Sequence, residues 1–217
     1  MELEDVFPVW NKLTQTQQHL LNKVSSKHKL EKGMLLHKGS TNCVGLVLVE
    51  TGQFRAYIVS ETGKEVTLYR LLERDICLFS ASCVLSGIQF EVNIEAEKDC
   101  EFWVIPPGAF QSLMEESAPV ANYANKLMAS RFSDGMWLMD QVMFKSFDVR
   151  LAEFLISEAN TQETNMLEIT HEKIANHLGS AREVVTRMLK YFQNEGMVKL
   201  ARGKIEITDR KKLEKLI

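Results

Sequence analysis

The pattern of hydrophobic and polar positions changes twice along the chain. Residues 10–22 show helical spacing, whereas from about 28 to 105 short apolar runs are separated by turn residues. Many short strands without long helices between them predict an antiparallel β-roll or barrel. Helical spacing returns from residue 107 onward, so the sequence predicts an α+β protein with its strands mainly in the N-terminal half.

The longest helical pattern runs from about residue 119 to residue 145, and its apolar positions recur at gaps of 4, 3, 4 and 3. This spacing is typical of a coiled-coil seam. A helix of about 27 residues is about 40 Å long, which is too long for its own small domain alone to cover. The pattern therefore favours a homodimer that pairs along the seam. The alternative is that the seam packs on the β-roll of its own chain. The seam positions are Met128, Phe132, Gly135, Met139 and Val142.

The stretch "ITHEKIANHLGSAREVVTRMLKYFQNEGMVKL", residues 169–200, contains two short helical patterns that meet at a Gly-Ser turn. Ala175 is small at the point where two helices must cross closely, and Gly179 permits a left-handed backbone at the turn. Ser180 and Glu183 have the spacing of a capping box that opens the second helix. Together these features predict a helix-turn-helix.

The exposed face of the second helix is predicted to be polar and basic. Arginine can read guanine through O6 and N7 in the major groove, and glutamate can accept a hydrogen bond from cytosine N4. The alternative is that the glutamate only caps the helix and the arginines form a solvated face. The coincidence of turn, spacing and basic face favours DNA recognition. The candidate DNA-binding residues here are Ser180, Arg182, Glu183, Thr186, Arg187 and Lys190.

The following segment, "GMVKLARGKIEITD", reads as two short strands that turn at Gly203. Arg202 and Lys204 lie at the predicted tip. A basic hairpin behind a recognition helix can hold DNA phosphates. The segment therefore predicts a wing and completes a winged helix-turn-helix.

Charge distribution agrees with a DNA-binding C-terminal part. Residues 170–217 carry 11 Lys and Arg against 6 Asp and Glu, whereas residues 1–169 carry 15 against 23. The basic balance after residue 170 favours a polyanionic partner. No phosphate loop, GxSxG or HExxH motif is present. The sequence therefore predicts a DNA-binding protein rather than an enzyme.

The same survey gives expectations for location and cysteine chemistry. No apolar run approaches the roughly 20 residues of a membrane span, and the first ten residues are acidic without an apolar core. We therefore expect a cytoplasmic protein that does not bind membranes. The four cysteines form no CxxC pair, so we expect four thiols, mostly buried, and no metal site.

The order of β-roll, long helix and winged helix-turn-helix resembles the Crp/Fnr family of bacterial transcription regulators over nearly the whole chain. "GSAREVVTRMLKYFQNEGMVKL" and "GKIEI" carry the resemblance, and "VLVETGQFRAY", "SETGKEVTLYRL" and "FDVRLAEFL" support it. It implies a double-stranded β-helix, like the cyclic nucleotide-binding jelly roll, at residues 1–117. It further implies a dimerisation helix at 118–146 and a DNA-binding domain at 147–217.

The resemblance also implies partners. They are a pseudo-palindromic double-stranded DNA operator, RNA polymerase, a second copy of the chain and a small effector held by the roll. Arg182, Glu183 and Arg187 stand where the cyclic-AMP-binding branch has its base-reading residues. We therefore expect a half-site closer to TGTGA than to the TTGAT of the oxygen-sensing branch. Whether the protein activates or represses is left open.

The effector motif departs from that of the cyclic-AMP-binding members. They carry Gly-Glu for the ribose and Arg-Ser for the cyclic phosphate, where this chain has Arg74-Asp75 and Phe90-Glu91. The phosphate-binding arginine is missing, and Glu91 would repel a phosphate. The polar pair that contacts adenine falls at Gly135 and Met136. We therefore expect no response to cyclic AMP.

The segment "DICLFSASCVLSGIQF" places Cys77 and Cys83 six residues apart, beside the former pocket. The pair has three interpretations: two small packing residues, a redox-active thiol pair, or a ligand for a cofactor such as haem through Cys77. If a short helix follows Arg74, its N-terminus would lower the Cys77 pKa. The oxygen-sensing members of the family hold an iron–sulfur cluster through cysteines near the N-terminus. No cysteine precedes Cys43 in this chain, so that arrangement is absent. An uncharged effector and a ligand-free structural roll also stay open.

Overall fold

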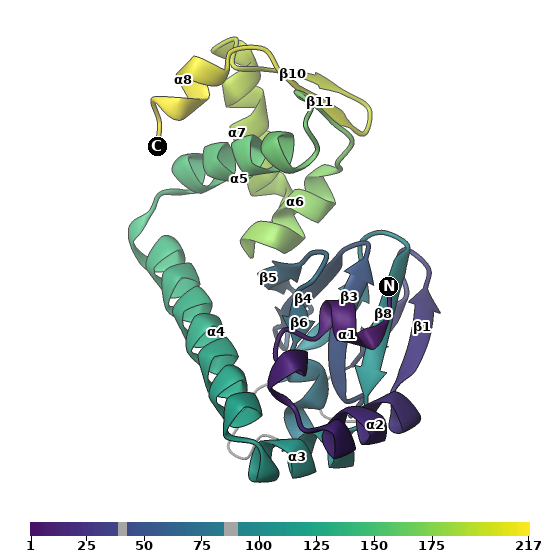
Figure 1. Ribbon diagram of the computed structural model, residues 1–217. Coiled ribbons are helices and arrows are strands. Elements are labelled where there is room, and N and C mark those ends of the chain that lie inside the picture. The colour runs from purple at the N-terminus through teal and green to yellow at the C-terminus, as the bar shows by residue number, and fades with distance from the viewer. Residues whose placement is uncertain (39–42, 85–90) are drawn as a thin grey trace. The chain divides into compact units, whose positions relative to one another are not determined.

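The computed structural model describes residues 1–38, 43–84 and 91–217 (Figure 1). They form two compact units. One unit consists of Met1–Val59 and Leu68–Gly135, and the other of Ser60–Thr67 and Met136–Ile217. Within the described residues, none of the helices has both the length and the apolar composition of a membrane span.

The first unit is built on two four-stranded sheets, and the strand pairs with defined register are antiparallel. This arrangement confirms the predicted antiparallel roll. One sheet has the order β1 (Ser26–Leu30), β8 (Cys100–Ile105), β3 (Leu46–Thr51) and β6 (Ile76–Cys77). The other has the order β2 (Leu35–His37), β7 (Asn93–Ala96), β4 (Phe54–Val59) and β5 (Glu65–Leu71).

Strand β3 is buried on both faces. Because side chains alternate along a strand, Leu46 and Leu48 enter one core cluster while Val47 and Val49 enter another. The first cluster joins this sheet to the flanking helices, and the second fills the inside of the roll. A strand with two buried faces needs a continuous apolar run, which explains the sequence LVLV.

The helices of the first unit cover the outer face of the β3 sheet. They are α1 (Leu3–Val6), the 3₁₀ turn η1 (Trp10–Lys12), α2 (Gln15–Val24) and α3 (Pro107–Glu116). The single helix predicted over residues 10–22 is instead η1 followed by α2, because Thr14 caps the new helix through its hydroxyl. Within α2, Leu20 is exposed and Leu21 is buried.

Helix α4 (Ala118–Phe144) has the length that the sequence predicts. Its N-terminal part packs on the first unit through Val120 and Ala124, and the seam residue Met128 joins this packing. The alternative of packing on the roll is therefore correct for Met128. Farther along, Phe132 is 70% exposed, and Met139 and Val142 are about half exposed. The C-terminal part of the seam is thus an open apolar stripe in the single chain.

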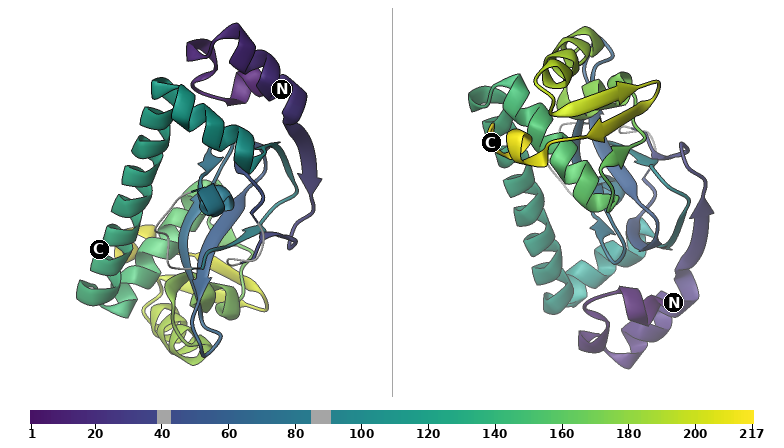
Figure 2. Two further views of the ribbon diagram at one scale, coloured as in Figure 1. Left: turned by 90° about the horizontal axis from the view of Figure 1, so that it is seen from below. Right: turned by 90° about the horizontal axis from the view of Figure 1, so that it is seen from above.

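The second unit contains the C-terminal helices and a three-stranded antiparallel sheet of order β10-β11-β9. Figure 2 shows the β10–β11 hairpin, in yellow, projecting from the side of this unit's helices. The two-residue strand β9 and the short helix α8 were not predicted from the sequence. The elements of the second unit are α5 (Phe147–Thr161), β9 (Met166–Leu167), α6 (His171–Leu178), α7 (Arg182–Asn194), β10 (Val198–Ala201), β11 (Lys204–Ile207) and α8 (Arg210–Glu214).

The structure corrects the expectations for the cysteines. Cys43 and Cys83 form a disulfide with a Cα–Cα separation of 5.8 Å, so the prediction of four free thiols is wrong, and the structure excludes the thiol pair among the three interpretations of Cys77 and Cys83. Cys77 and Cys100 are free and buried. Arg74 is followed by strand β6 rather than by a helix, and the 3₁₀ segment η2 (Phe79–Val84) comes afterwards. Cys77 therefore lies at the end of a strand, two residues before η2, and not in the first turn of a helix.

Burial raises the pKa of the Cys77 thiol. The sequence-based expectation of a lowered pKa is therefore wrong, because the hydration that a buried thiolate loses outweighs the stabilisation that Ser80, Tyr69 and the Arg131 cation give it. The side chain lies inside the roll, where it belongs to the core cluster of Val47 and Val49. Cys77 is a packing residue in this structure.

Gly45, at the start of β3, provides a test of this packing. Its φ is +114°, and an added Cβ would lie 2.2 Å from the Ile105 carbonyl oxygen. Because Leu46 pairs with Ile105 in the sheet, that carbonyl cannot move freely. We expect Gly45→Ala to lower the free energy of unfolding in urea by about 2–4 kcal/mol.

The matched control is Gly63→Ala. Gly63 also has a positive φ, of +78°, but an added Cβ would meet no described atom within 4 Å. In that variant the free energy of unfolding should fall only by the cost of placing alanine in a left-handed conformation, about 1–2 kcal/mol. Equal losses in the two variants would show that the approach of Ile105 does not constrain the strand.

Candidate nucleic-acid interface

Helices α6 and α7 cross at a tight turn around Gly179. The glycine has φ +63° and ψ +38°, the left-handed conformation that the sequence predicts for it. The N–H groups of Gly179 and Ser180 both donate to the carbonyl of Ala175, which closes the end of α6. Ala175 is buried at the crossing. The predicted helix-turn-helix is therefore present, with the small residue and the turn glycine in their expected places.

The predicted capping box is wrong. Helix α7 begins at Arg182 with Ala181 as its N-cap, and no side chain caps it. Ser180 lies one residue too early, since its backbone is used to finish α6. Glu183 consequently lies in the first turn of α7 with an exposed side chain. A glutamate in the first turn interacts favourably with the positive end of the helix dipole.

Helix α7 divides into a buried and an exposed face. Val185, Leu189 and Phe192 are fully buried in the core of the second unit. The opposite face presents Arg182, Glu183, Arg187 and Lys190 to solvent, and Thr186 is half-buried between them. Five of the predicted DNA-binding residues thus share one helix, and four of them are exposed together.

Thr186 is held by two neighbours within the protein. Its hydroxyl donates to the carbonyl of Arg182 at 2.9 Å and lies 2.9 Å from Nδ1 of His171, the first residue of α6. Because a hydroxyl has a single proton, His171 Nδ1 is then the donor in the second bond. Burial and the nearby Arg182 cation lower the pKa of His171, which keeps the ring neutral near pH 7. The chain of bonds fixes the first turn of α7 against α6.

The wing is a short hairpin. Strands β10 and β11 pair from Val198 with Ile207 to Ala201 with Lys204. Gly203 adopts φ +72° in the turn, and Arg202 is exposed beside it. Lys204 Nζ forms an ion pair with Glu168 Oε1 at 2.6 Å, and both side chains are exposed. The sequence did not predict this acidic neighbour.

Arg150 of α5 supports the helix-turn-helix from behind. Its Nη1 donates to the carbonyl of Leu178 at the end of α6, at 3.2 Å, and its guanidinium lies 5.5 Å from the centre of the Phe147 ring. Burial lowers the pKa of Arg150. The stretch FDVRLAEFL was noted in the sequence, but its alternation gave no sign that the arginine would bond to a carbonyl 28 positions away.

The described effector-pocket candidates have different surroundings. Asp75 accepts a hydrogen bond from the N–H of Leu72 in the turn before β6. Cys83 is in the disulfide, and Glu91 is exposed. Gly135 is exposed, with no described atom within 4 Å of the position of a Cβ. Cys77 is in the core, Met136 is exposed, and Phe90 lies outside the described residues.

A different group of residues joins the roll to α4. The Arg131 guanidinium lies 4.2 Å from the centre of the Tyr69 ring and pairs with Asp134 at 2.7 Å. Tyr69 in turn contacts the Phe79 ring, with 6.0 Å between ring centres. The Tyr69 hydroxyl is buried, makes no hydrogen bond of standard geometry among the described residues, and interacts with the Cys77 thiol. Burial raises the pKa of Tyr69 well above its ordinary value.

Two family models match the chain. A model of Crp-like helix-turn-helix domains matches residues 149–216, and a model of cyclic nucleotide-binding domains matches residues 27–117. A solved structure of a regulator of the Crp/Fnr family from Eubacterium rectale ATCC 33656 superposes with a TM-score of 0.96. It is 56% identical, over 98% of this chain and 99% of that one.

Curated relatives are more distant. The chain is 24% identical over 200 residues to electron transport regulator A of Shewanella oneidensis, covering 89% of this chain and 79% of that protein. It is 26% identical over 171 residues to the cyclic AMP receptor protein of Thermus thermophilus, covering 79% of this chain and 78% of that protein.

Proposed function

The chain belongs to the Crp/Fnr family of DNA-binding transcription regulators, and on this basis we propose that it reads a specific operator as a homodimer under control of its β-roll. The observation that carries the proposal is the joint exposure of Arg182, Glu183 and Arg187 on α7. The opposite face of that helix is fixed in the core of a helix-turn-helix. This face can enter a major groove without any rearrangement of the unit.

Each exposed group has a chemical role at the DNA. Arg182 and Arg187 are the groups suited to guanine, and Glu183 suits cytosine N4. Lys190, together with Arg202 and Lys204 on the wing, suits backbone phosphates. Ser180, whose backbone closes the turn, lies at the same end of α7 and can reach a phosphate with its hydroxyl.

We assign three functional segments to the chain. Residues 1–117 are the sensing roll, residues 118–146 the dimerisation helix and residues 147–217 the DNA-binding domain. The protein acts in the cytoplasm on double-stranded DNA together with RNA polymerase, and it performs no enzymatic reaction. The members of its family are transcription regulators, which supports this assignment.

The dimer partner binds along the second half of α4. Phe132, Met139 and Val142 share one face of the helix at seam spacing, and all three are largely exposed in the single chain. A second copy would bury this stripe and place two copies of α7 about one DNA turn apart. Regulators of this family act as dimers, which supports the arrangement.

Control at the roll operates through the contact of α4 with the strands. The Arg131–Tyr69 contact joins the long helix directly to β5 and, through Phe79, to η2. An uncharged effector that reaches the buried Tyr69 hydroxyl would bias this contact. The alternative is a roll that holds no ligand and serves only as the body of the dimer. Titrating cell extract into the DNA-binding assay separates the two, because only the first responds.

The function is tested by selecting binding sites from random DNA. We expect an inverted repeat whose half-sites resemble TGTGA, with centres about one helical turn apart. This expectation follows from the match of Arg182, Glu183 and Arg187 to the base-reading positions of the cyclic-AMP-binding branch. Recovery of sequences without any inverted repeat would contradict the proposal.

Base-reading and phosphate-binding side chains should respond differently to substitution. Arg187→Ala should weaken operator binding by about 1–3 kcal/mol and relax the preference at one base position. Lys204→Ala should weaken binding to all sequences about equally. It should also reduce the slope of the logarithm of the binding constant against the logarithm of salt concentration by about one. Both effects are measured by fluorescence anisotropy at several salt concentrations.

Two further variants serve as controls for Lys204. Glu168→Gln removes the anionic partner of the lysine and should strengthen binding to all sequences slightly, because an exposed ion pair is worth little. Lys23→Ala removes an equal charge from an exposed position of α2 and should leave affinity unchanged. A change in base preference with Lys204→Ala would show that the wing reads sequence.

Dimerisation should fail when a charge enters the seam. Met139→Glu would place two carboxylates opposite each other in an apolar contact, so we expect monomers and loss of operator binding. Sedimentation velocity measures the mass, with Ser130→Glu as the matched control on an exposed part of the same helix outside the seam. An intact dimer of the Met139→Glu protein would place the interface elsewhere.

Cyclic AMP should not bind. The arginine that makes charge-assisted bonds to the cyclic phosphate in other members is absent, and Glu91 is exposed at the corresponding segment. We expect no heat of binding in isothermal titration calorimetry up to millimolar cyclic AMP, with a cyclic-AMP-binding member of the family as the positive control. Micromolar binding would show that other residues hold the phosphate.

A further inference from the structure

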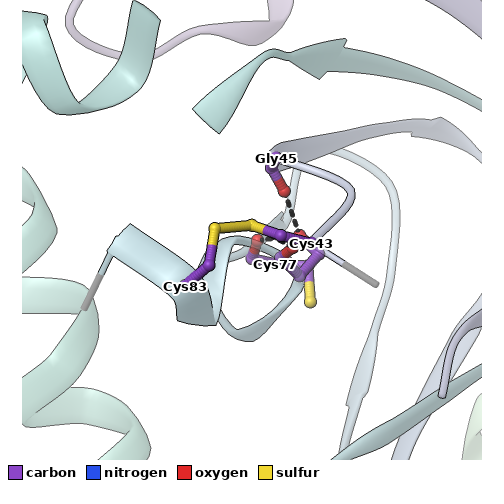
Figure 3. The surroundings of a disulfide bond; sticks show 5 residues. Cys43, Gly45, Cys77 and Cys83 are labelled. Atoms are coloured by element: carbon purple, nitrogen blue, oxygen red, sulfur yellow. Dashed lines mark hydrogen bonds between the residues drawn. A yellow bond between two sulfur atoms is a disulfide. The ribbon is translucent and has the colours of Figure 1, made fainter. Parts of the chain in front are cut away.

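The disulfide between Cys43 and Cys83 joins the segment before β3 to η2 (Figure 3). Cys43 is half-buried and directly precedes the segment that enters β3, whereas Cys83 is exposed near the end of η2. The bond joins positions 40 residues apart in the sequence. We propose that this disulfide is a reversible redox switch, opened by a dithiol reductant at Cys83, that alters how η2 supports α4. The regulatory part of this inference rests on the proposed function.

The two backbone segments are held together without the disulfide. The N–H groups of Val44 and Gly45 both donate to the Ser80 carbonyl at 3.1 Å. The buried Ser80 hydroxyl lies 2.6 Å from the Gly45 carbonyl and 2.7 Å from that of Cys77, so it can donate to either. After reduction, these bonds keep Ser80 beside the start of β3, so Cys83 stays tethered three residues from an anchored position. Re-oxidation of Cys43 and Cys83 is intramolecular and proceeds at a high effective concentration.

The part of η2 that carries Cys83 is separated from Ser80 by a bend. Ala81 has φ −106° and ψ +27°, which are not helical values, so η2 bends at this residue. The Ser80 hydrogen bonds lie before the bend, and Cys83 lies after it. The disulfide is thus the covalent attachment of the post-bend segment to the start of β3. Breaking it releases this segment while the strand pairing of β3 with β6 remains.

The reaction follows ordinary thiol–disulfide exchange. A thiolate of the dithiol reductant attacks Sγ of the exposed Cys83 and forms a mixed disulfide, and the bond to Cys43 breaks. Sγ of Cys43 leaves as a thiolate, takes a proton from water and lies 3.9 Å from the Ser80 carbonyl oxygen, an acceptor for its S–H. The second thiol of the reductant then displaces Cys83. Two electrons pass to the protein disulfide, and the reductant becomes a disulfide.

The remaining cysteines do not interfere. Cys77 and Cys100 are buried, and burial raises the pKa of each thiol. Neither therefore supplies an accessible thiolate that would exchange with the disulfide. Figure 3 shows the Cys77 sulfur apart from the bonded pair. The switch consequently has two defined states rather than a mixture of pairings.

Segment η2 contacts α3, the helix that precedes α4. Val84, next to Cys83, packs against the cluster that contains Leu113 of α3 and Val120 and Ala124 of α4. Reduction loosens the attachment of Val84 and so changes the support of the N-terminal part of α4. The same helix carries the exposed seam, so the redox state biases the geometry of the dimer.

The first experiment maps the thiols of the full-length native protein. Protein equilibrated with oxidised dithiothreitol is labelled with a maleimide, digested and analysed by mass spectrometry, before and after reduction with dithiothreitol. Cys43 and Cys83 should label only after reduction and become protected again when the oxidised reagent is restored. Cys77 and Cys100 should label only after unfolding. Labelling of Cys43 and Cys83 in the oxidised sample would overturn the inference.

The second experiment measures operator affinity of the oxidised and reduced protein, with the duplex obtained by selection. The operator dissociation constants of the oxidised and the reduced wild type should differ at least about fivefold. Cys43→Ser and Cys83→Ser should each bind like the reduced form in both conditions. Cys100→Ser, a matched control at a buried thiol, should keep the wild-type response.

The outcomes separate the two proposals. Equal affinity of the oxidised and reduced wild type, with thiol mapping that confirms reversible cleavage, would overturn the regulatory part of the inference. If no form binds any duplex, the proposed function fails, and the regulatory part fails with it. Thiol mapping would still decide the chemistry of the bond. Circular dichroism of each serine variant confirms that it is folded, and the reduced wild type gives the same comparison without any substitution.

Discussion

The first unit depends on the burial of β3 on both faces. Leu46 and Leu48 bind the sheet to the outer helices, while Val47 and Val49 hold it to the opposite sheet. A strand in this position cannot shift its register by one residue without exchanging the two sets of side chains. The close approach of Gly45 to the Ile105 carbonyl fixes the same register from the backbone side. Both the disulfide and the contacts of α4 are positioned by this strand.

The second unit depends on a single carbonyl in a comparable way. The Ala175 oxygen accepts two N–H groups from the turn, and Arg150 donates to the Leu178 carbonyl at the end of α6. These bonds set the direction in which α7 leaves α6. The His171–Thr186 bond adds a second connection on the exposed side. The polar face of α7 is thus oriented by groups that do not themselves belong to it.

Local sequence predicted the features that depend on neighbouring residues. The run LVLV predicted a strand in the roll, and the spacing of Ala175 and Gly179 predicted the helix crossing. It did not predict the Cys43–Cys83 bond, because that pairing requires β3 and β6 to be adjacent. Proximity in sequence instead suggested Cys77 as the partner of Cys83. The Cys77 side chain points into the core, because side chains alternate along strand β6.

The candidate DNA-binding face was predicted more fully than the sensing region. Arg182 and Arg187 follow from helical periodicity alone, so their exposure agreed with expectation. Ser180 did not cap α7, because the turn uses its backbone first. The Tyr69–Arg131 contact joins a strand to a helix far along the chain, and no spacing rule connects them. The acidic partner of Lys204 was missed for the same reason.

The distribution of tryptophans has a spectroscopic consequence. The chain has three: Trp10 is buried, Trp103 is half-buried, and Trp137 on α4 is 62% exposed. An indole in water emits at longer wavelength than one in an apolar surrounding. The red edge of the intrinsic fluorescence therefore comes mainly from Trp137. A shift of that edge to shorter wavelength would report that another surface covers this part of the long helix, without any added label.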